Sequence, residues 1–235
     1  MALLRVSGLD VAYGGARVLF GVGLAVDRGE VVALLGRNGA GKTTTLKCVM
    51  GLVRPLSGRI VFGDRDITGF EAHAISRLGI GYVPEDRRIF TSLNVVENLE
   101  VGRRARREGA PQWTVERVFS LFPGLAEIRD RRASQISGGE QQMLTVARTL
   151  MGNPSLLLLD EPSEGLAPRI VERMAEMIGR LKGEGLAILL AEQNLRFTGQ
   201  LADRAYVIET GGVRWQGPMA DFLADEAVQR AYLSV

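Results

Sequence analysis

The sequence predicts an α/β fold with a mixed, largely parallel central sheet. Aliphatic runs at residues 31–35, 156–159 and 187–191 indicate short strands buried on both faces, which is typical of parallel sheets. From about residue 87 to residue 150 the apolar spacing is helical, so we expect helices inserted between these strands. Residues 1–30 alternate between apolar and polar side chains, which predicts antiparallel strands at the amino-terminal end.

Composition limits the class of protein. The chain has 235 residues, 46% of them hydrophobic, which suffices for one domain or for one domain with a lobe. Its apolar runs are far shorter than the roughly 18 residues that cross a bilayer, and we expect no signal peptide. The single cysteine, Cys48, excludes an internal disulfide and is typical of a cytoplasmic protein, and we expect it to be buried.

The charged residues limit the class of protein less than the composition does. The net charge of +2 offers no argument for nucleic-acid binding. The arginine-rich segment 103–107 could bind an acidic partner, but we interpret it as the solvated face of a helix. The only histidine, His73, is expected on a surface helix. Residues 204–217 indicate a hairpin around Gly211 and Gly212, and residues 218–233 indicate a terminal helix.

A glycine-rich loop follows the strand at residues 31–35. The segment "GRNGAGKTT" fits the pattern G-x-x-x-x-G-K-[ST] and is followed by a helical stretch, which is the context that a phosphate-binding loop requires. Its glycines let backbone N–H groups point at phosphate oxygens. The expected nucleotide contacts are Gly36, Asn38, Gly39, Gly41, Lys42, Thr43 and Thr44. Lys42 would pair with the outer phosphates, and the Thr43 hydroxyl would ligate Mg²⁺. The alternative is a glycine-rich turn with a chance lysine.

Two carboxylates end the leucine-rich strand at residues 156–159. Ligands of open α/β sheets collect beyond the carboxyl ends of the strands, where Asp160 and Glu161 emerge. Because neighbouring side chains of a strand point to opposite sides, the two acids are expected to differ in role. We assign Asp160 to Mg²⁺ and Glu161 to the water that attacks the γ-phosphate. An acidic strand terminus without a catalytic role is the alternative.

A second helix start lies between these two sites. Ser137 and Glu140 have the spacing of a capping box, and the apolar spacing predicts a helix from Gly138 to about residue 151. Ser137, Gly138 and Gly139 would leave a positive helix end that suits a phosphate. Since the phosphate loop already holds the phosphates of its own nucleotide, we expect this end to serve a nucleotide bound elsewhere.

These motifs together resemble an ATP-binding subunit of an ABC transporter, over essentially the whole chain. The segment "ISGGEQQ" is similar to the family signature, with Ile136 and Glu140 as departures, and the order of the motifs is the family's order. The resemblance implies a RecA-like mixed sheet core, an amino-terminal antiparallel β-subdomain and an inserted helical lobe. The expected division of the single domain 1–235 is a core of residues 1–86 and 151–235 with a lobe of residues 87–150.

Other positions take their expected roles only from this resemblance. Tyr13 matches the aromatic residue that stacks on adenine, although a core tyrosine is the alternative. Residues 163–168 occupy the place of the loop that contacts the partner's site, where Ala167 and Pro168 depart from the family pattern. Glu85 stands where the family has a glutamine that senses Mg²⁺. Gln193 stands where it has a histidine that contacts the γ-phosphate, so it is expected to act without titrating near neutral pH.

The resemblance also implies partners. In the family, two ATP-binding domains enclose ATP between the phosphate loop of one and the signature of the other, against two transmembrane permease subunits at the cytoplasmic face of the membrane. Segments such as "VPEDRRIF" and "AEQN" are similar to the ATPase subunits of branched-chain amino acid importers, which act indirectly with a solute-binding protein. An importer of another small polar solute, such as urea or amides, is an alternative. A non-transport ATP-binding module, or a regulatory one that hydrolyses ATP poorly, is another.

Overall fold

The structure is a computed structural model that describes residues 2–107 and 111–233. Residues 1, 108–110 and 234–235, which the expected domain includes, lie outside the described residues. The strands are β1 (Ala2–Tyr13), β2 (Ala16–Asp27), β3 (Val31–Leu35), β4 (Ser57–Phe62), β5 (Arg65–Asp66), β6 (Ile80–Val83), β7 (Leu156–Asp160), β8 (Ala187–Glu192), β9 (Arg204–Glu209) and β10 (Gly212–Pro218).

Several helices fall within residues 87–150, where the apolar spacing predicted them. They are α1 (Lys42–Val49), α2 (Ala72–Leu78), α3 (Val95–Gly102), α4 (Val115–Leu121), α5 (Pro123–Glu127), the short 3-10 helix η1 (Ala133–Gln135), α6 (Gly138–Leu150), α7 (Pro168–Gly183), α8 (Leu195–Gly199), α9 (Met219–Ala224) and α10 (Glu226–Leu233). Within the described residues, none of these helices combines the length and the apolar character needed to cross a bilayer.

Two sheets form the framework, and they confirm the predicted fold class. The amino-terminal sheet has the order β2-β1-β4-β5 with antiparallel pairs, and the central sheet has the order β10-β9-β3-β8-β7-β6. Strands β9, β3, β8, β7 and β6 are parallel, whereas β10 pairs with β9 as the predicted antiparallel hairpin. In this register Leu35 pairs with Glu192, and Asp160 pairs with Ala191. The carboxyl ends of β3, β8 and β7 therefore lie at the same edge of the sheet.

The core lies on both faces of the central sheet. The leucines of β7 are fully buried, with Leu157 and Leu159 facing a cluster that includes α6 and α7, and Leu156 and Leu158 facing a cluster that includes α1. This two-sided burial explains why the strand is an uninterrupted apolar run rather than an alternating one. It fixes β7, with Asp160 at its end and Glu161 directly after it, between a layer of helices and a layer that contains α1 and the amino-terminal sheet.

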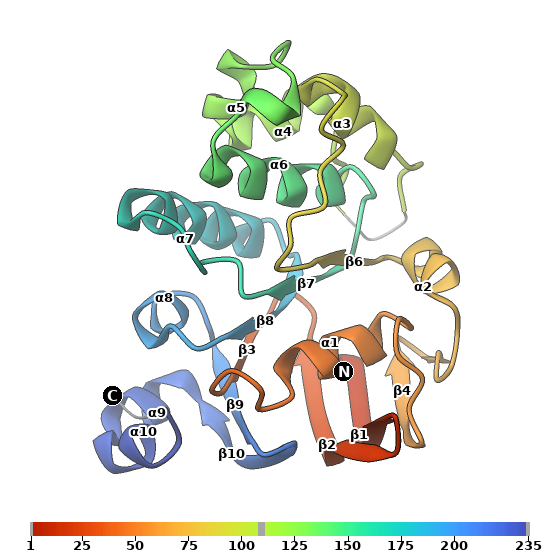
Figure 1. Cartoon of the computed structure of the whole chain (residues 1–235), viewed down its shortest axis with the longest axis vertical. Coiled ribbons are helices and arrows are strands. Elements are labelled where there is room, and N and C mark those ends of the chain that lie inside the picture. Colours follow the sequence, from red (N-terminus) through yellow and green to blue (C-terminus); the bar gives the residue numbers. More distant parts are fainter. Residues whose placement is uncertain (1, 108–110, 234–235) are drawn as a thin grey trace.

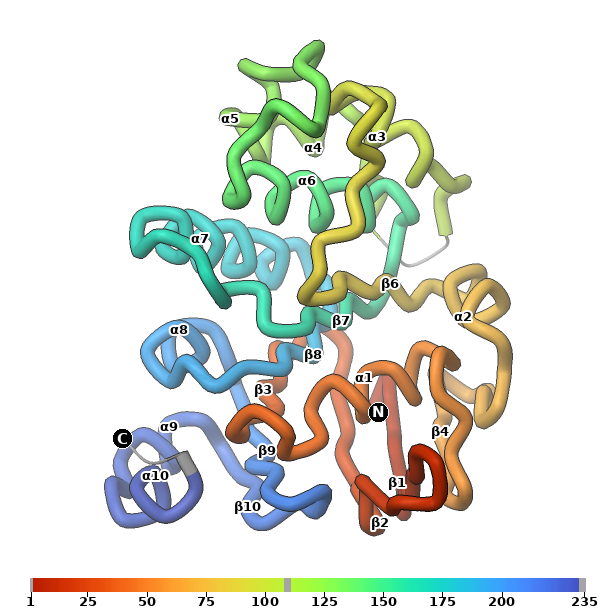
Figure 2. The backbone as a smooth tube through the Cα atoms, in the orientation of Figure 1, coloured from red at the N-terminus to blue at the C-terminus, as the bar shows by residue number. Residues whose placement is uncertain are grey.

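Helices α3 to α6 group at one end of the molecule, at the top of Figure 1. The tube in Figure 2 leaves β6, passes through these helices and returns along α6 to β7. Because β6 and β7 are paired neighbours in the sheet, the helices are an insertion between two adjacent parallel strands. The start of α6 is thereby carried on a different layer from the glycine loop before α1.

Two local expectations are wrong. Residues 103–107 are irregular rather than helical, because α3 ends at Gly102 and the N–H of Arg104 donates to the backbone oxygen of Met151 instead of continuing the helix. Arg107 instead donates to backbone carbonyl oxygens, among them those of Asn153 and Ser76. The terminal segment forms two helices, since Asp225 ends α9 and its carboxylate accepts from the N–H of Val228 in α10.

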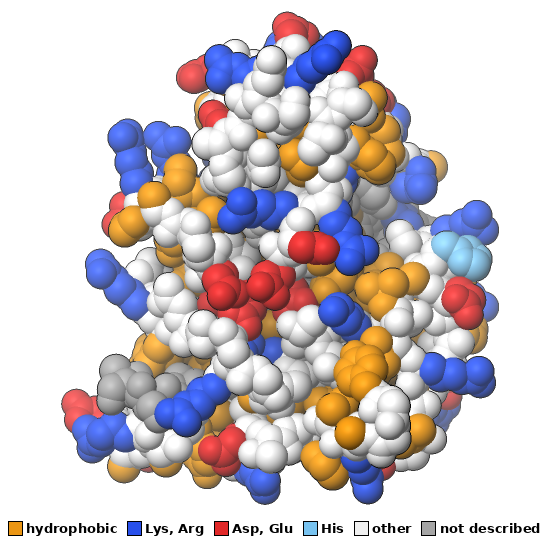
Figure 3. Space-filling view, in the orientation of Figure 1, with side chains coloured by type: hydrophobic (Ala, Val, Ile, Leu, Met, Phe, Trp, Pro, Cys, Tyr) orange, Lys and Arg blue, Asp and Glu red, His pale blue; other side chains and the backbone are white. Residues whose placement is uncertain are grey.

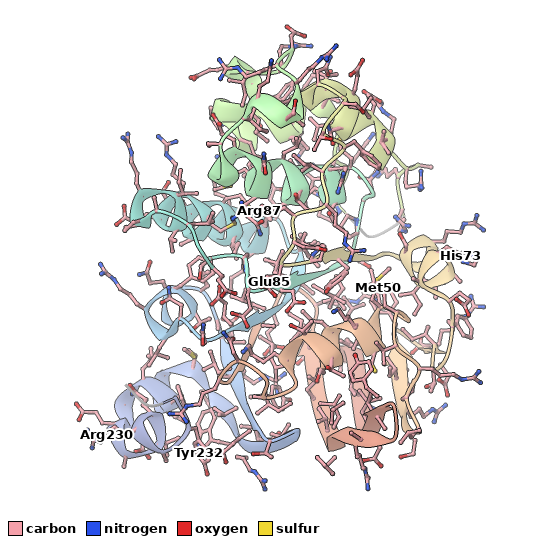
Figure 4. All side chains as sticks on the ribbon, in the orientation of Figure 1. Met50, His73, Glu85, Arg87, Arg230 and Tyr232 are labelled. Carbon is pink, nitrogen blue, oxygen red and sulfur yellow. The ribbon has the colours of Figure 1, made fainter. Side chains whose placement is uncertain are left out.

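Two other expectations are confirmed. Cys48 is buried in α1, and burial raises the pKa of its thiol to about 12. His73 is exposed on α2 and points away from the centre of the molecule (Figure 4). No imidazole therefore lies near the carboxyl ends of the central strands.

Candidate functional site

The glycine loop connects β3 to the first turn of α1. Gly39 and Gly41 have φ angles of 80° and 112°, a left-handed conformation that glycine adopts without strain. A Cβ atom on Gly36 would lie 2.4 Å from the backbone oxygen of Ile208, so the folded chain leaves no room for a side chain there. No side chain caps α1. The first N–H groups of this helix therefore remain available to an anion.

A cavity of about 280 Å³ lies over this loop. Most of the expected nucleotide contacts line it, together with a valine of β2 and glutamates from the loops that follow β6 and β7. The lining residues are Val18, Asn38, Gly39, Gly41, Lys42, Thr43, Thr44, Glu85, Glu161 and Glu164. Gly36 does not line the cavity, but its backbone oxygen accepts a hydrogen bond from the Lys42 side chain at 2.7 Å.

Lys42 is the first residue of α1, and it is only 3% exposed. Its ammonium donates to the backbone oxygens of Gly36 and Arg37, the latter at 3.0 Å, and lies 3.0 Å from Glu161 Oε1. A buried ammonium requires such a partner, because an unpaired charge in the interior is costly. The lysine thus connects the glycine loop to the end of β7.

Asp160, the last residue of β7, is held by two hydroxyl groups. Thr43 Oγ1 donates to Oδ1 at 2.8 Å, and the Tyr82 hydroxyl donates to Oδ2 at 2.8 Å. Burial raises the pKa of Asp160, while the hydrogen bonds from Tyr82 and Thr43 act in the opposite direction. Tyr82 was not expected at the site. Its only sequence signal is a hydroxyl-bearing side chain within the apolar strand β6.

The Thr43 hydroxyl and the Asp160 carboxylate meet the requirements of Mg²⁺. Both are hard oxygen donors, and proteins hold this ion with one or two carboxylates while phosphate oxygens and water complete its shell. Within the described residues, no group of three or more His, Cys, Asp or Glu side chains is arranged to hold a metal ion. A metal at this site would therefore take most of its ligands from the nucleotide and from water.

Glu161 follows β7 directly and has a φ angle of 45°, which is uncommon for a residue with a side chain and is frequent at functional sites. Its N–H donates to the backbone oxygen of Ala191 at 2.9 Å. One carboxylate oxygen, Oε1, contacts Lys42, whereas Oε2 is buried without a hydrogen-bond partner in the described part of the chain. A buried acceptor left unpaired in this way can receive a hydrogen bond from a water molecule.

Glu85 lies in the exposed turn after β6 and lines the cavity. Figure 4 labels it near the centre of the view, where Figure 3 shows a group of acidic side chains. Glu164, which was not expected at the site, lines the cavity as well. Burial raises the pKa of Glu164, and the charges of Glu161 and Glu85 raise it further. The cavity therefore combines a buried lysine and a helix end with several carboxylates, one of which contacts the lysine.

Tyr13 and Gln193 do not line this cavity, and neither do Gly36 and Asp160. Tyr13 lies at the end of β1 and is 46% exposed, so the alternative of a core tyrosine is wrong. Val18 of β2 lines the cavity instead. Gln193 is exposed, directly after β8. The preceding residue, Glu192, is almost fully buried at the same edge of the sheet and was not expected to have a role.

The second helix start lies apart from the cavity. Ser137 Oγ accepts from the Glu140 N–H at 3.3 Å, and the Ser137 N–H donates to Glu140 Oε2 at 2.6 Å, which confirms the capping box. Ser137 is exposed, while Gly138 and Gly139 are half-buried. None of the three lines the nucleotide cavity of its own chain. The fold therefore places these three residues beside one another but does not bring them to the cavity that Lys42 lines.

Comparisons with known proteins agree with this fold. Residues 19–164 match a family model described as ABC transporter. The chain is 42% identical over 231 residues to the high-affinity branched-chain amino acid transport ATP-binding protein BraG of Pseudomonas aeruginosa, covering 98% of this chain and 99% of that protein. It is 38% identical over 235 residues to the lipopolysaccharide export system ATP-binding protein LptB of Escherichia coli K12, covering 99% and 98%.

Solved structures give the same result. An ATP-binding cassette of an ABC transporter in its ADP conformation matches with a TM-score of 0.84 and 27% identity, covering 100% of both chains. A nucleotide-free cassette matches with a TM-score of 0.83 and 27% identity, covering 97% of both. This chain belongs to the ATP-binding subunits of ABC transporters. The family resemblance expected from the sequence is confirmed.

Proposed function

We propose that this chain hydrolyses ATP in a Mg²⁺-dependent reaction. The observation that carries the proposal is the contact of 3.0 Å between the Lys42 ammonium and Glu161 Oε1, beside the unpaired Oε2 of the same carboxylate. The Lys42 ammonium is suited to the outer phosphates of ATP. Glu161 Oε2 is suited to accept the hydrogen bond of the attacking water and to take its proton.

The other expected contacts would position the nucleotide, the attacking water and Mg²⁺. Asn38, Gly39, Gly41 and Thr44 line the cavity around the phosphates, and the exposed ring of Tyr13 would stack on adenine. Gln193 would donate to the γ-phosphate or orient the water. Thr43 and Asp160 would hold Mg²⁺, with Glu85 accepting from a metal-bound water. A bound Mg²⁺ supplies positive charge that neutralises the phosphate oxygens.

We further propose that the working unit is a pair of ATP-binding subunits, in which the second subunit is a copy of this chain or a related one. Ser137, Gly138 and Gly139 start a helix whose positive end lies outside the cavity of its own chain, which supports a role toward the nucleotide of a partner. ATP would then bind more tightly to the closed pair than to the open one, and this difference would drive closure. Two transmembrane permease subunits would anchor the pair at the cytoplasmic face of the membrane.

For the transported substrate we propose branched-chain amino acids, delivered by a solute-binding protein. The 42% identity to BraG over nearly the whole chain supports this proposal. Export of lipopolysaccharide is the second candidate, because the identity to LptB is 38% over 235 residues, a similar length. The described residues of the nucleotide cavity cannot distinguish the two, since they face ATP in either case. Another small polar solute, such as urea or an amide, remains the alternative within import.

The catalytic proposal is tested by Mg-ATP turnover of the purified chain and of Glu161→Gln, with association followed by size-exclusion chromatography. Glu161→Gln should lose at least about 100-fold in turnover while it still binds ATP, and ATP should convert it into a dimer. Glu172→Gln, which removes an exposed carboxylate of α7, is the matched control and should turn over normally. Retained turnover in Glu161→Gln would exclude Glu161 as the base, and turnover that survives chelation with EDTA would exclude the role of Mg²⁺.

The substrate proposal is tested in proteoliposomes that contain this chain with the two permease subunits of its complex. A leucine-loaded solute-binding protein should stimulate ATP turnover and leucine uptake. Stimulation by a urea- or amide-loaded binding protein would mean that the complex imports that solute instead of leucine. Stimulation by lipopolysaccharide, with no response to leucine, would support the exporter and reject import.

A further inference from the structure

Glu192 lies at the centre of the site without lining its cavity. It is the last residue of β8, the strand between β3, which leads into the glycine loop, and β7, which leads into Asp160. It is 1% exposed and pairs in register with Leu35. A carboxylate buried to this degree is costly unless specific hydrogen bonds hold it in place.

The Glu192 carboxylate divides its two oxygens between two loops. Oε1 accepts from the N–H of Ser163, in the loop after β7, at 2.9 Å. Oε2 accepts from the N–H groups of Gln193 and Asn194, in the loop after β8, at 3.1 Å and 3.2 Å. Burial raises the pKa of Glu192, while the hydrogen bonds from Ser163 and Asn194 oppose this shift. One side chain thus joins residues that are 29 positions apart in the sequence.

This bridge holds the residue proposed as the base from both sides. The N–H of Glu161 is bonded to Ala191, the neighbour of Glu192 in β8. Two positions later, the N–H of Ser163 is bonded to Glu192 itself. The backbone of Glu161, with its uncommon positive φ, is therefore fixed to β8 on each side. The same carboxylate fixes the start of the loop that carries Gln193.

We propose that Glu192 is a positioning residue for hydrolysis, which keeps Glu161 and Gln193 in register by bridging the loops that carry them. The proposal rests on the function proposed above. Only a glutamate can serve both loops, because each of its oxygens is an acceptor. A glutamine offers one oxygen and one NH₂ group, so an N–H of one loop would face a donor. An aspartate also has two acceptor oxygens, but its side chain is one carbon shorter than that of glutamate.

The test compares Glu192→Gln with the parent chain. A positioning role predicts that kcat for Mg-ATP falls at least tenfold while the dissociation constant for ATP stays within threefold, because the glycine loop is untouched. Glu209→Gln is the matched control, since it removes a carboxylate from the last residue of β9, a strand that β3 separates from β8, where the side chain is 45% exposed. It should stay within twofold in both quantities.

Amide hydrogen exchange gives the second readout. In Glu192→Gln, peptides that cover residues 161–166 and 193–198 should exchange faster than in the parent, while peptides of β3 should not change. If Glu192→Gln fails to fold, amide exchange in the parent chain alone shows whether the bridge exists. Its Ser163 amide must exchange more slowly than that of exposed Gly165, and equal rates would mean that the bridge does not exist in solution.

Several outcomes would overturn the proposal. Turnover of Glu192→Gln within twofold of the parent would show that the bridge does not matter for hydrolysis. A parallel loss of ATP affinity and melting temperature would show a purely structural role. A parent chain that binds ATP but does not turn it over, with or without a partner subunit, would reject the proposed function instead, and this inference with it.

Discussion

The helix starts at Lys42 and at Gly138 use similar residues and have different surroundings. Before α1, the folded chain encloses Gly36 and Gly41 but not Gly39. Cβ atoms on Gly36 and Gly41 would lie 2.4 Å from the Ile208 backbone and 2.5 Å from the Leu19 side chain. Before α6, a Cβ atom on Gly138 would meet only the end of the Arg87 side chain, at 2.7 Å. In Figure 4, Arg87 lies between Glu85 and α6.

Capping separates the two sites further. No side chain caps α1, whereas Ser137 and Glu140 already take part of the hydrogen-bonding capacity at the start of α6. Glu140 also brings a negative charge to an end that is expected to meet phosphate. Under the proposed function, the first helix start would be complete as an anion site within one chain. The second would become an anion site when a partner brings its nucleotide, and the following changes test this difference.

The largest effect is expected from Lys42→Ala. Removal of a charged donor from the phosphates should weaken ATP binding by about 10- to 100-fold. Titration of ATP into the purified chain measures it, with Lys47→Ala in the last turn of the same helix as the control. An unchanged affinity would mean that the α1 end does not bind the phosphates. Because Glu161 loses its buried partner, the melting temperature should fall as well.

The second prediction concerns the glycines. Gly36→Ala forces a methyl group against backbone that cannot move aside, which should cost about 1–3 kcal/mol and lower the melting temperature by about 2–4 °C per kcal/mol. Gly138→Ala should stay within about 2 °C of the parent, because a flexible arginine side chain can withdraw. Thermal unfolding of both variants gives the comparison. Equal losses would show that the two loops are enclosed to the same degree.

A smaller effect is expected from Glu140→Gln. Glutamine preserves the capping box and removes the negative charge, so ATP-dependent dimerisation should strengthen about two- to fivefold. The measurement is the ATP concentration at half-maximal dimerisation, made in the Glu161→Gln background. Glu127→Gln, at an exposed position of α5, controls for net charge. Weaker dimerisation in Glu140→Gln would show that the carboxylate contacts the partner favourably.

The smallest effect is expected on the reactivity of cysteine thiols toward a chemical label. Because burial raises the pKa of Cys48 to about 12, its thiol should be almost unreactive at pH 8 in the folded chain and should react on unfolding. In Ser137→Cys, a second thiol at the exposed start of α6 should react within minutes and become protected when ATP induces dimerisation. Mass spectrometry counts the labels. Labelling of Ser137→Cys that ATP does not change would argue against a partner at this helix end.

The sequence pattern predicted the glycine loop, the buried strand β7 and the capped start of α6, because their signals are local. The glycine spacing, the run of leucines and the capping box each depend on residues close together in the chain. The same locality explains the two errors. A run of arginines has no helical signal of its own once Gly102 ends α3, and nothing near Asp225 predicts that its carboxylate would start a new helix.

Residues that act across the sheet could not be predicted in this way. Tyr82 reaches Asp160 from the neighbouring strand, and Glu164 and Val18 enter the cavity from other loops and from another sheet. Their roles depend on strand order and register, which local patterns do not fix. Tyr13 and Gln193, taken from family resemblance, are exposed and do not line the cavity of the single chain.

The sequence by itself therefore determined the α/β class, the phosphate loop, the paired acids and the second helix start, because each is encoded by a few neighbouring residues. Only the tertiary structure decided that Lys42 meets Glu161 and that Glu192 joins the loops after β7 and β8. The physical reason is that these contacts are mainly short-range hydrogen bonds and ion pairs between segments that are distant in the sequence. They exist only after the buried strands have aligned their carboxyl ends at one edge of the sheet.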